Sequence, residues 1–295
     1  MSLSPLRVRG HSADVNIKTS TTSSQASTEV RDAEILGLTT TLVGTSLQDK
    51  TSPIIISTTT GINELIETID ALATHPPSLY VDLEGVNLSR NGTISILQIY
   101  IMPCDTTYLI DVYVLKKDAF TYRTPLGRNL KEIFETPSIP KVFFDVRNDS
   151  DALYSHFGIR LAGVQDLQLM ELATRSFSKR RVNGLARCIE HDASMTTAEI
   201  REWSVAKEKG KNLFAPERGG SYEVFNVRPL TTEIVQYCIQ DVRFLPTLWR
   251  NYNGKLRGHW KSKVEIEVQN RIKLSQSRDY NGKGPHMALA PRGWK

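Results

Sequence analysis

The sequence has few cysteines and lacks any apolar run long enough to cross a membrane. Its three cysteines, Cys104, Cys188 and Cys238, are far apart in a chain of 295 residues. An odd, scattered set favours neither a disulfide framework nor the paired spacing of a zinc site, so we expect core thiols. The longest apolar stretches, such as ISILQIYIM, are far shorter than the roughly 20 residues of a membrane-spanning helix.

The N-terminus lacks the apolar core of a secretory signal. MSLSPLRVRGHSADV is polar and basic, which predicts an intracellular protein, in the nucleus or cytoplasm, without membrane association. Residues 19–28 hold eight hydroxyl residues in ten and cannot bury enough surface to offset chain entropy. We therefore predict a disordered Ser/Thr-rich tail over residues 1–51. A targeting presequence is the alternative, but no amphipathic helix is evident.

Negative charge is scarce in two regions of the second half. Residues 175–218 hold ten Lys or Arg against six acids, and residues 251–295 hold ten against three. The net charge of +5 is modest, so this distribution is more informative than the total. It favours a polyanionic partner, although basic residues also keep surfaces soluble.

The middle of the chain alternates predicted strands and helices. β-Branched and aromatic residues predict strands over 78–86, 94–102, 107–114 and 141–144, with Asn91-Gly92 as a hairpin signal between the first two. Apolar spacing predicts helices over 62–72, 126–135, 150–157, 167–174, 184–191, 196–207 and 231–251. This order fits an α/β protein with a mixed β-sheet flanked by helices and a largely helical C-terminal half.

Acidic residues recur in three separated segments. Asp82 and Glu84 lie two residues apart on a predicted strand and so share a face. Asp151 lies in NDSDALYSHF, and Asp241 follows Tyr237 by one turn of a predicted helix. Carboxylates are the ligands that hard cations prefer, and two such cations can clamp the attacking and leaving oxygens of a phosphodiester displacement. Together the four acids indicate one two-metal site.

In these segments the chain resembles 3′-5′ exonucleases of the DEDD superfamily, in the tyrosine-bearing (DEDDy) subgroup that includes ribonuclease D. The resemblance rests on VDLEG, on NDSDALYSHFGI followed by VQDLQLMELA, and on the Tyr237-to-Asp241 spacing, in that order along the chain. It implies a ribonuclease H-like fold with a 3′-5′ exonuclease domain over residues 52–255. Residues 256–295 then form a basic C-terminal helix and tail, of which we expect 281–295 to fray.

The resemblance also implies roles for five residues. Asp82, Glu84, Asp151 and Asp241 would hold two Mg²⁺ or Mn²⁺ ions, and Tyr237 would orient the attacking water. Asp151 is chosen because it precedes its helix as the second acid of the family does. Two nearby acids stay outside the site on this interpretation: Asp145 as an ion-pair partner of Arg147 and Asp149 as a helix cap, while Asp166 is expected to play a supporting role.

The function implied is a two-metal-dependent 3′-5′ exonuclease. It would release nucleoside 5′-monophosphates from single-stranded RNA or DNA, with RNA somewhat favoured, and the sequence names no protein partner. The alternative is a catalytically silent RNA-binding adaptor, since Egalitarian-like exonuclease domains resemble this chain around DVRNDSDALYSHFGI.

Overall fold

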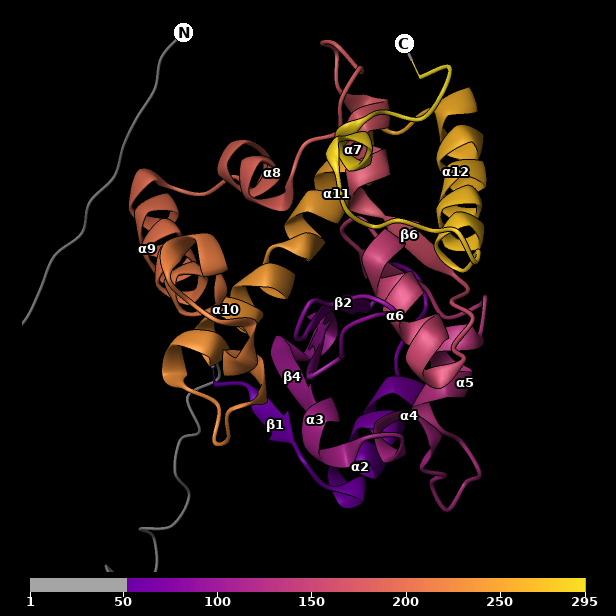
Figure 1. The fold of residues 1–295 in the computed structure, drawn as a ribbon. Coiled ribbons are helices and arrows are strands. Elements are labelled where there is room, and N and C mark those ends of the chain that lie inside the picture. Colours follow the sequence, from indigo (N-terminus) through magenta and orange to yellow (C-terminus); the bar gives the residue numbers. More distant parts are fainter. Residues whose placement is uncertain (1–51, 295) are drawn as a thin grey trace, which may run out of the picture. The chain divides into compact units, whose positions relative to one another are not determined.

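The computed structural model describes residues 52–294 and places a mixed six-stranded sheet at their centre (Figure 1). The strand order is β1-β4-β3-β2-β5-β6. Strands β2, β3 and β4 pair antiparallel, whereas β1 pairs with β4, β2 with β5 and β5 with β6 in parallel. The strands are β1 (Ile54–Ile56), β2 (Leu79–Glu84), β3 (Ile96–Ile101), β4 (Thr106–Asp111), β5 (Lys141–Phe143) and β6 (Val164–Asp166). The predicted mixed sheet is confirmed.

Strands β2 and β3 occupy the middle of the sheet because they are apolar on both faces. Every residue of β3 is buried, and in β2 only Asp82 and Glu84 are partly accessible. Such near-continuous apolar runs are typical of strands covered on both sides. The two strands form the predicted hairpin, in which Asp82 lies opposite Gln98.

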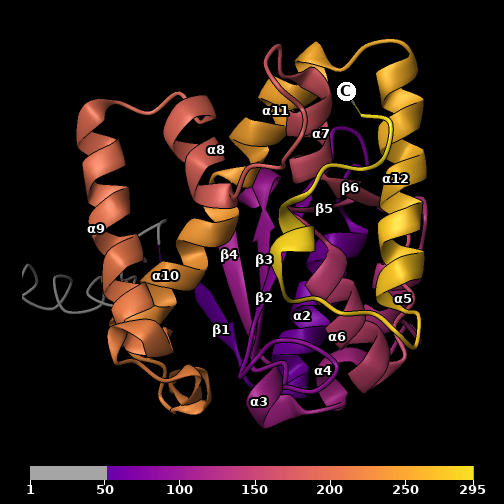
Figure 2. The same cartoon turned by 45° about the horizontal axis from the view of Figure 1, so that its top comes forward.

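Helices cover both faces of the sheet (Figures 1 and 2). On one side α10 packs against β2, β3 and β4, and α9 packs on α10. On the other side α12 packs against α6, α7 and β6. The helices are α2 (Thr59–Asp70), α3 (Val112–Leu115), α4 (Asp118–Thr121), α5 (Leu130–Glu135), α6 (Arg147–Phe157), α7 (Leu167–Thr174), α8 (Leu185–Asp192), α9 (Thr197–Phe214), α10 (Thr232–Arg243), α11 (Leu245–Lys255) and α12 (His259–Ser275).

The single helix predicted over residues 231–251 is two helices, α10 and α11, which meet at Phe244. Pro246 is the physical reason. A proline has no backbone N–H to continue the ladder of α10, and its ring clashes with the carbonyl four residues earlier. In the first turn of α11 the same proline is tolerated.

The C-terminal segment is folded onto the domain. Trp294 is buried, Val182 N donates to Ala288 O at 3.0 Å, and Ala290 N donates to Arg180 O at 3.1 Å. The expectation that this end frays is therefore wrong for residues 281–294. Its glycines and prolines form turns that are held by long-range backbone hydrogen bonds, which composition does not reveal.

The structure tests the expectation about the cysteines but not the one about the N-terminal tail. Cys188 and Cys238 are buried as predicted, but Cys104 is exposed in the short turn Met102–Cys104, so the prediction of core thiols is wrong there. The disordered tail predicted over residues 1–51 lies outside the described residues. Within residues 52–294, none of the helices has the length and apolar character needed to cross a membrane.

Candidate active site

Three predicted acids meet where β2 faces α10. Asp82 and Glu84 project from the same face of β2, and Asp241 projects from α10, which packs on that strand. One carboxylate oxygen from each of the three lies within 4.8 Å of the others. Oxygens bound to one small divalent cation at about 2.0–2.4 Å are separated by up to about 4–5 Å, so this donor set fits a hard cation.

Tyr237 lies one turn before Asp241 on the same face of α10 and is buried. Its ring meets Phe214 edge-on, with centroids 5.0 Å apart. Burial, followed by the Asp241 and Glu84 carboxylates, raises the pKa of the Tyr237 phenol well above its ordinary value. The phenol therefore stays neutral beside the carboxylates and can donate or accept a hydrogen bond.

The carboxylates resist ionisation in one another's presence. Burial and the Asp241 carboxylate raise the pKa of Asp82 to about 8. Burial, then Asp82 and Asp241, raises the pKa of Glu84 well above its usual range. Buried like charges behave in this way until a cation neutralises them. The electrostatics of the cluster therefore favour a bound cation.

Asp151 is not brought into this cluster. Its carboxylate faces the β2–β3 loop, where Oδ1 accepts from Arg90 Nε at 2.6 Å and Oδ2 accepts from Arg90 N at 2.8 Å. The same guanidinium donates to the carbonyl of Ser275 at the end of α12 and to those of Ser277 and Arg278 beyond it. Asp151 thus ties helix α6 to that loop and to the C-terminal segment.

Asp149 is the acid of α6 that faces the cluster. It is buried, and no hydrogen bond or ion pair joins its carboxylate to another residue of the described chain. Burial, then the Asp82 carboxylate, raises its pKa well above the ordinary value. Since α6 begins at Arg147, Asp149 and Asp151 point about 200° apart around the helix. The expected cap role of Asp149 is wrong, because the N-cap position is Val146.

The sequence carried a signal for Asp149 in the faces of α6. Asp149 precedes Ala152 and Leu153 by three and four residues, and both are fully buried, whereas Asp151 precedes the exposed Ser155 by four. Residues three and four apart share a face of a helix. If the predicted helix had begun at Arg147 and not at Ser150, its buried face would have indicated Asp149 as the site residue.

Asp166 supports the start of α6, as expected. Its carboxylate accepts from the backbone N–H groups of Asp145 and Val146, each at 3.2 Å, and from Arg271 Nη1 at 2.7 Å. Asp145 also pairs with Arg147 at 2.5 Å, as predicted. These bonds fix the turn from β5 into α6 and so fix the direction in which Asp149 points.

A cation that the sequence did not single out lies beside the acids. The Nζ of Lys207, on α9, pairs with Asp241 Oδ1 and lies 3.9 Å from the centroid of the Tyr237 ring. Lys207 is buried. In the sequence it is one of three lysines at alternate positions, 207, 209 and 211, and no local pattern distinguishes it from its neighbours.

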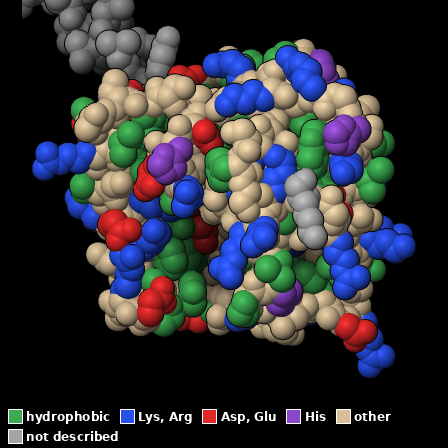
Figure 3. Space-filling view, turned by 90° about the horizontal axis from the view of Figure 1, so that it is seen from above, with side chains coloured by type: hydrophobic (Ala, Val, Ile, Leu, Met, Phe, Trp, Pro, Cys, Tyr) green, Lys and Arg blue, Asp and Glu red, His purple; other side chains and the backbone are tan. Residues whose placement is uncertain are grey.

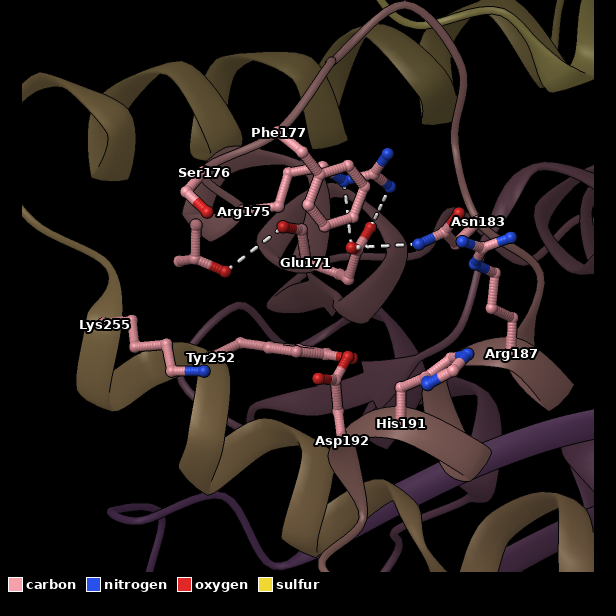
Figure 4. A pocket seen from close by; sticks show the side chains of 11 residues that line it. Glu171, Arg175, Ser176, Phe177, Asn183, Arg187, His191, Asp192, Tyr252 and Lys255 are labelled. Carbon is pink, nitrogen blue, oxygen red and sulfur yellow. Dashed lines mark hydrogen bonds and ion pairs between the residues drawn. The ribbon is translucent and has the colours of Figure 1, made fainter.

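A separate cavity of about 520 Å³ between α7, α8 and α11 has a different chemistry (Figure 4). Its two carboxylates already have partners: Glu171 pairs with Arg175, and Asp192 accepts from Tyr252 Oη at 2.8 Å. Arg187, His191 and Lys255 line the rest. With its acids engaged and cations around them, this cavity does not offer the ligand set of a metal site.

The fold and the site together define a class: an α/β protein in which partly accessible carboxylates on a central strand of a mixed sheet converge with a buried carboxylate on a packed helix, in an arrangement that fits a divalent cation. Residues 53–257 match the model of a family described as 3′-5′ exonuclease. The chain belongs to this family of DEDD-type exonucleases, and this membership supports nuclease function.

Individual relatives agree with this assignment. The piRNA biogenesis protein EXD1 of Mus musculus is 29% identical over 171 residues, which cover 57% of this chain but only 27% of the mouse protein. RNase D of Trypanosoma brucei in complex with RNA U12 superposes with a TM-score of 0.64 at 20% identity, covering 82% of this chain and 78% of the other. RNase D of Escherichia coli gives 0.52 at 20% identity, covering 77% and 51%. At this identity the two structures show a shared fold.

Proposed function

We propose that the protein is a two-metal-dependent 3′-5′ exonuclease that releases nucleoside 5′-monophosphates from single-stranded nucleic acid, with RNA somewhat favoured over DNA. The convergence of Asp82, Glu84 and Asp241, with carboxylate oxygens within 4.8 Å of one another, is the observation that carries the proposal. Mg²⁺ or Mn²⁺ suits such oxygen ligands.

Asp149 completes this proposed site in place of Asp151. Asp82, Glu84 and Asp241 would hold one ion, and Asp82 with Asp149 would hold the other. The Asp151 carboxylate is engaged by Arg90 and acts instead as a structural anchor for α6. Placing Asp149 here gives four acids from β2, α6 and α10, which is the number that the sequence motifs imply.

The side chains around the acids supply positioning. The neutral Tyr237 phenol would accept or donate a hydrogen bond and so orient a water for attack on the terminal phosphodiester. When bound, the divalent ions would make that water more acidic and stabilise charge on the phosphate. The 3′ oxygen of the penultimate nucleotide then leaves, which defines the product as a nucleoside 5′-monophosphate.

A nucleic-acid substrate fits the charge of the surface. The face drawn in Figure 3 is hollowed, with acidic side chains in the hollow and lysine and arginine side chains around it. The two basic segments noted in the sequence also meet: Lys179 Nζ lies 5.4 Å from the ring centroid of Trp260. Cations that contact phosphates add sequence-independent affinity. The preference for RNA is supported by the fold shared with an RNase D bound to RNA.

Degradation of 5′-labelled single-stranded RNA and DNA, with Mg²⁺, Mn²⁺ or EDTA, tests the proposal. We expect a metal-dependent ladder that shortens from the 3′ end, faster on RNA, with nucleoside 5′-monophosphates as the released product. Asp82→Ala should abolish it, whereas Asp118→Ala, which removes an exposed acid of α4, should not. Cleavage in EDTA, or a ladder from the Asp82→Ala variant, would refute metal-dependent catalysis by these acids.

The adaptor alternative predicts another outcome of the same assay. An adaptor would bind single-stranded RNA tightly in a gel-shift assay and leave it intact with either metal. The presence of every acid and of Tyr237 favours catalysis.

A further inference from the structure

Lys207 is placed by the packing of α9 on α10. The buried residues of α9 are Trp203, Lys207 and Gly210, which follow one another at four and three residues and so form one stripe. The rest of the helix is exposed or partly exposed. A lysine in the middle of a buried stripe is costly unless its charge is paired, so its position requires an explanation.

The contact between the two helices is too close to allow the lysine much freedom. A Cβ atom on Gly210 would lie 2.5 Å from Cδ2 of Tyr237, so the backbone of α9 packs directly on that ring. The start of α9 is fixed by a capping box in which Thr196 and Glu199 bond each other's backbone N–H groups. Lys207 lies one turn before Gly210 on the same face of α9. The close packing of this face on α10 therefore places the ammonium of Lys207 against the Tyr237 ring and the Asp241 carboxylate.

The ammonium acts on all three acids of the cluster. It pairs with Asp241, and its charge also lowers the pKa of Asp82 and of Glu84 against the effect of burial. Asp241 is at the same time one of the three residues whose oxygens converge into the proposed metal site. The ammonium and a metal ion would thus share one carboxylate and repel each other across a few ångströms.

We propose that Lys207 is a positioning residue, a built-in counterion that holds Asp241 in place and weakens metal binding by competing for its carboxylate. This inference rests on the proposed function, because it assumes that the acids bind a divalent cation. The lysine gives the protein a site that keeps its shape without metal and that exchanges metal readily, since each ion entering the site must displace or approach a fixed positive charge.

Binding of Mn²⁺ measured by calorimetry, at one neutral pH and without nucleic acid, tests the inference. Lys207→Met should bind Mn²⁺ about tenfold more tightly than the wild type, because a like charge is removed from a poorly screened site. Lys207→Arg keeps the charge and should stay within about threefold of the wild type. Lys209→Met removes an exposed charge from the same helix and is the matched control. Equal or weaker Mn²⁺ binding by Lys207→Met would overturn the inference.

Thermal unfolding provides a second readout. In EDTA the midpoint of Lys207→Met should fall below that of the wild type, because Asp241 loses its partner, and the rise on adding Mn²⁺ should be larger in the variant. Should Lys207→Met fail to fold, Lys207→Gln is also neutral and is predicted to shift both readouts the same way. A Mn²⁺-induced rise no larger in the neutral variants than in the wild type would contradict the inference.

Asp82→Ala distinguishes a failure of the proposed role of Lys207 from a failure of the proposed metal site. Suppose that the wild type binds Mn²⁺, that Asp82→Ala does not, and that Lys207→Met binds with unchanged affinity. This result would overturn the role of the lysine but would still support the metal site. Absence of Asp82-dependent binding in every variant would overturn the metal site and the role of the lysine with it.

Discussion

Asp149 and Asp151 differ in what their carboxylates contact. Asp151 accepts hydrogen bonds from the side chain and the backbone N–H of Arg90, whereas Asp149 is buried near Asp82 with no partner among the described residues. A buried carboxylate without a partner is costly, and such residues cluster at functional sites. At the residue scale we therefore propose separable roles for the two acids, one in the site and one in the structure around it.

Replacing each acid by its amide should separate these roles. Asp149→Asn should lower kcat/KM on single-stranded RNA by at least about a hundredfold, because it removes a charged metal ligand, while the protein stays as stable or becomes more stable. Asp151→Asn should cost about 1–3 kcal/mol of stability through its weakened bond to Arg90, and the folded enzyme should keep its activity within about tenfold. Steady-state kinetics and urea unfolding measure both. Loss of catalysis in Asp151→Asn alone would restore the assignment made from the sequence.

Local spacing was enough to place some site residues and not others. Asp82 and Glu84 follow the period of a strand, and Tyr237 and Asp241 follow the period of a helix, so each pair could be assigned to one face. Lys207 could not be found in this way, because its pairing with Asp241 depends on how α9 packs on α10. We propose Asp149 where the sequence predicted Asp151, because α6 begins at Arg147, three residues before the start at Ser150 that the sequence indicated.

At the scale of elements, the sheet and most helices follow from periodicity, while the contacts that fix them do not. Arg90 reaches the carbonyl of Ser275, and Arg271 reaches Asp166, across long separations in sequence. Both arginines link α12 or its end to the elements that carry the acids. The sequence predicted a basic helix in this segment but not its contacts, so its contribution to the position of α6 could not be anticipated.

Strand β5 carries a buried lysine that bonds to the end of helix α5 and should make the stability of the protein depend on pH. Lys141 is fully buried, and its Nζ donates to the carbonyls of Ile133 at 3.0 Å and Thr136 at 2.7 Å at the end of α5. Burial lowers the pKa of this ammonium from 10.5 to about 7. Between these values the unfolded chain binds more protons than the folded chain, so stability should rise with pH through that window.

Comparison with Lys141→Met tests this expectation. Below pH 7 Lys141 is protonated in both the folded and the unfolded wild type, so the full cost of burying its charge lowers stability. Above pH 7 the free energy of unfolding of the wild type should increase relative to that of the variant, by at most about 1.4 kcal/mol per pH unit. Urea unfolding at pH 6 to 9 measures the difference. Lys131→Met is the accessible control, since Lys131 Nζ also donates to helix-end carbonyls, those of Phe157 and Gly158. A pH-independent difference for Lys141→Met would show that the buried lysine stays charged.

At the scale of the whole molecule, the acids lie where the two layers of helices meet the sheet. Strand β2 supplies Asp82 and Glu84, α10 supplies Asp241, and in the proposed site α6 supplies Asp149. The order of motifs along the chain predicted that Asp82, Glu84 and Asp241 converge, because elements of a mixed sheet bring distant segments together, but it did not predict Asp149. The folding of the C-terminal segment onto the domain and the close packing of α9 depend on tertiary contacts, so the sequence did not predict them.

The position of bound Mn²⁺ tests the account most directly. Crystals of the protein grown with MnCl₂ would locate the ions by anomalous diffraction at the manganese edge. We predict one peak bounded by Asp82, Glu84 and Asp241 and a second peak bounded by Asp82 and Asp149, both absent from crystals of Asp82→Ala. Manganese bound at Asp151, or no manganese at these four acids, would contradict it.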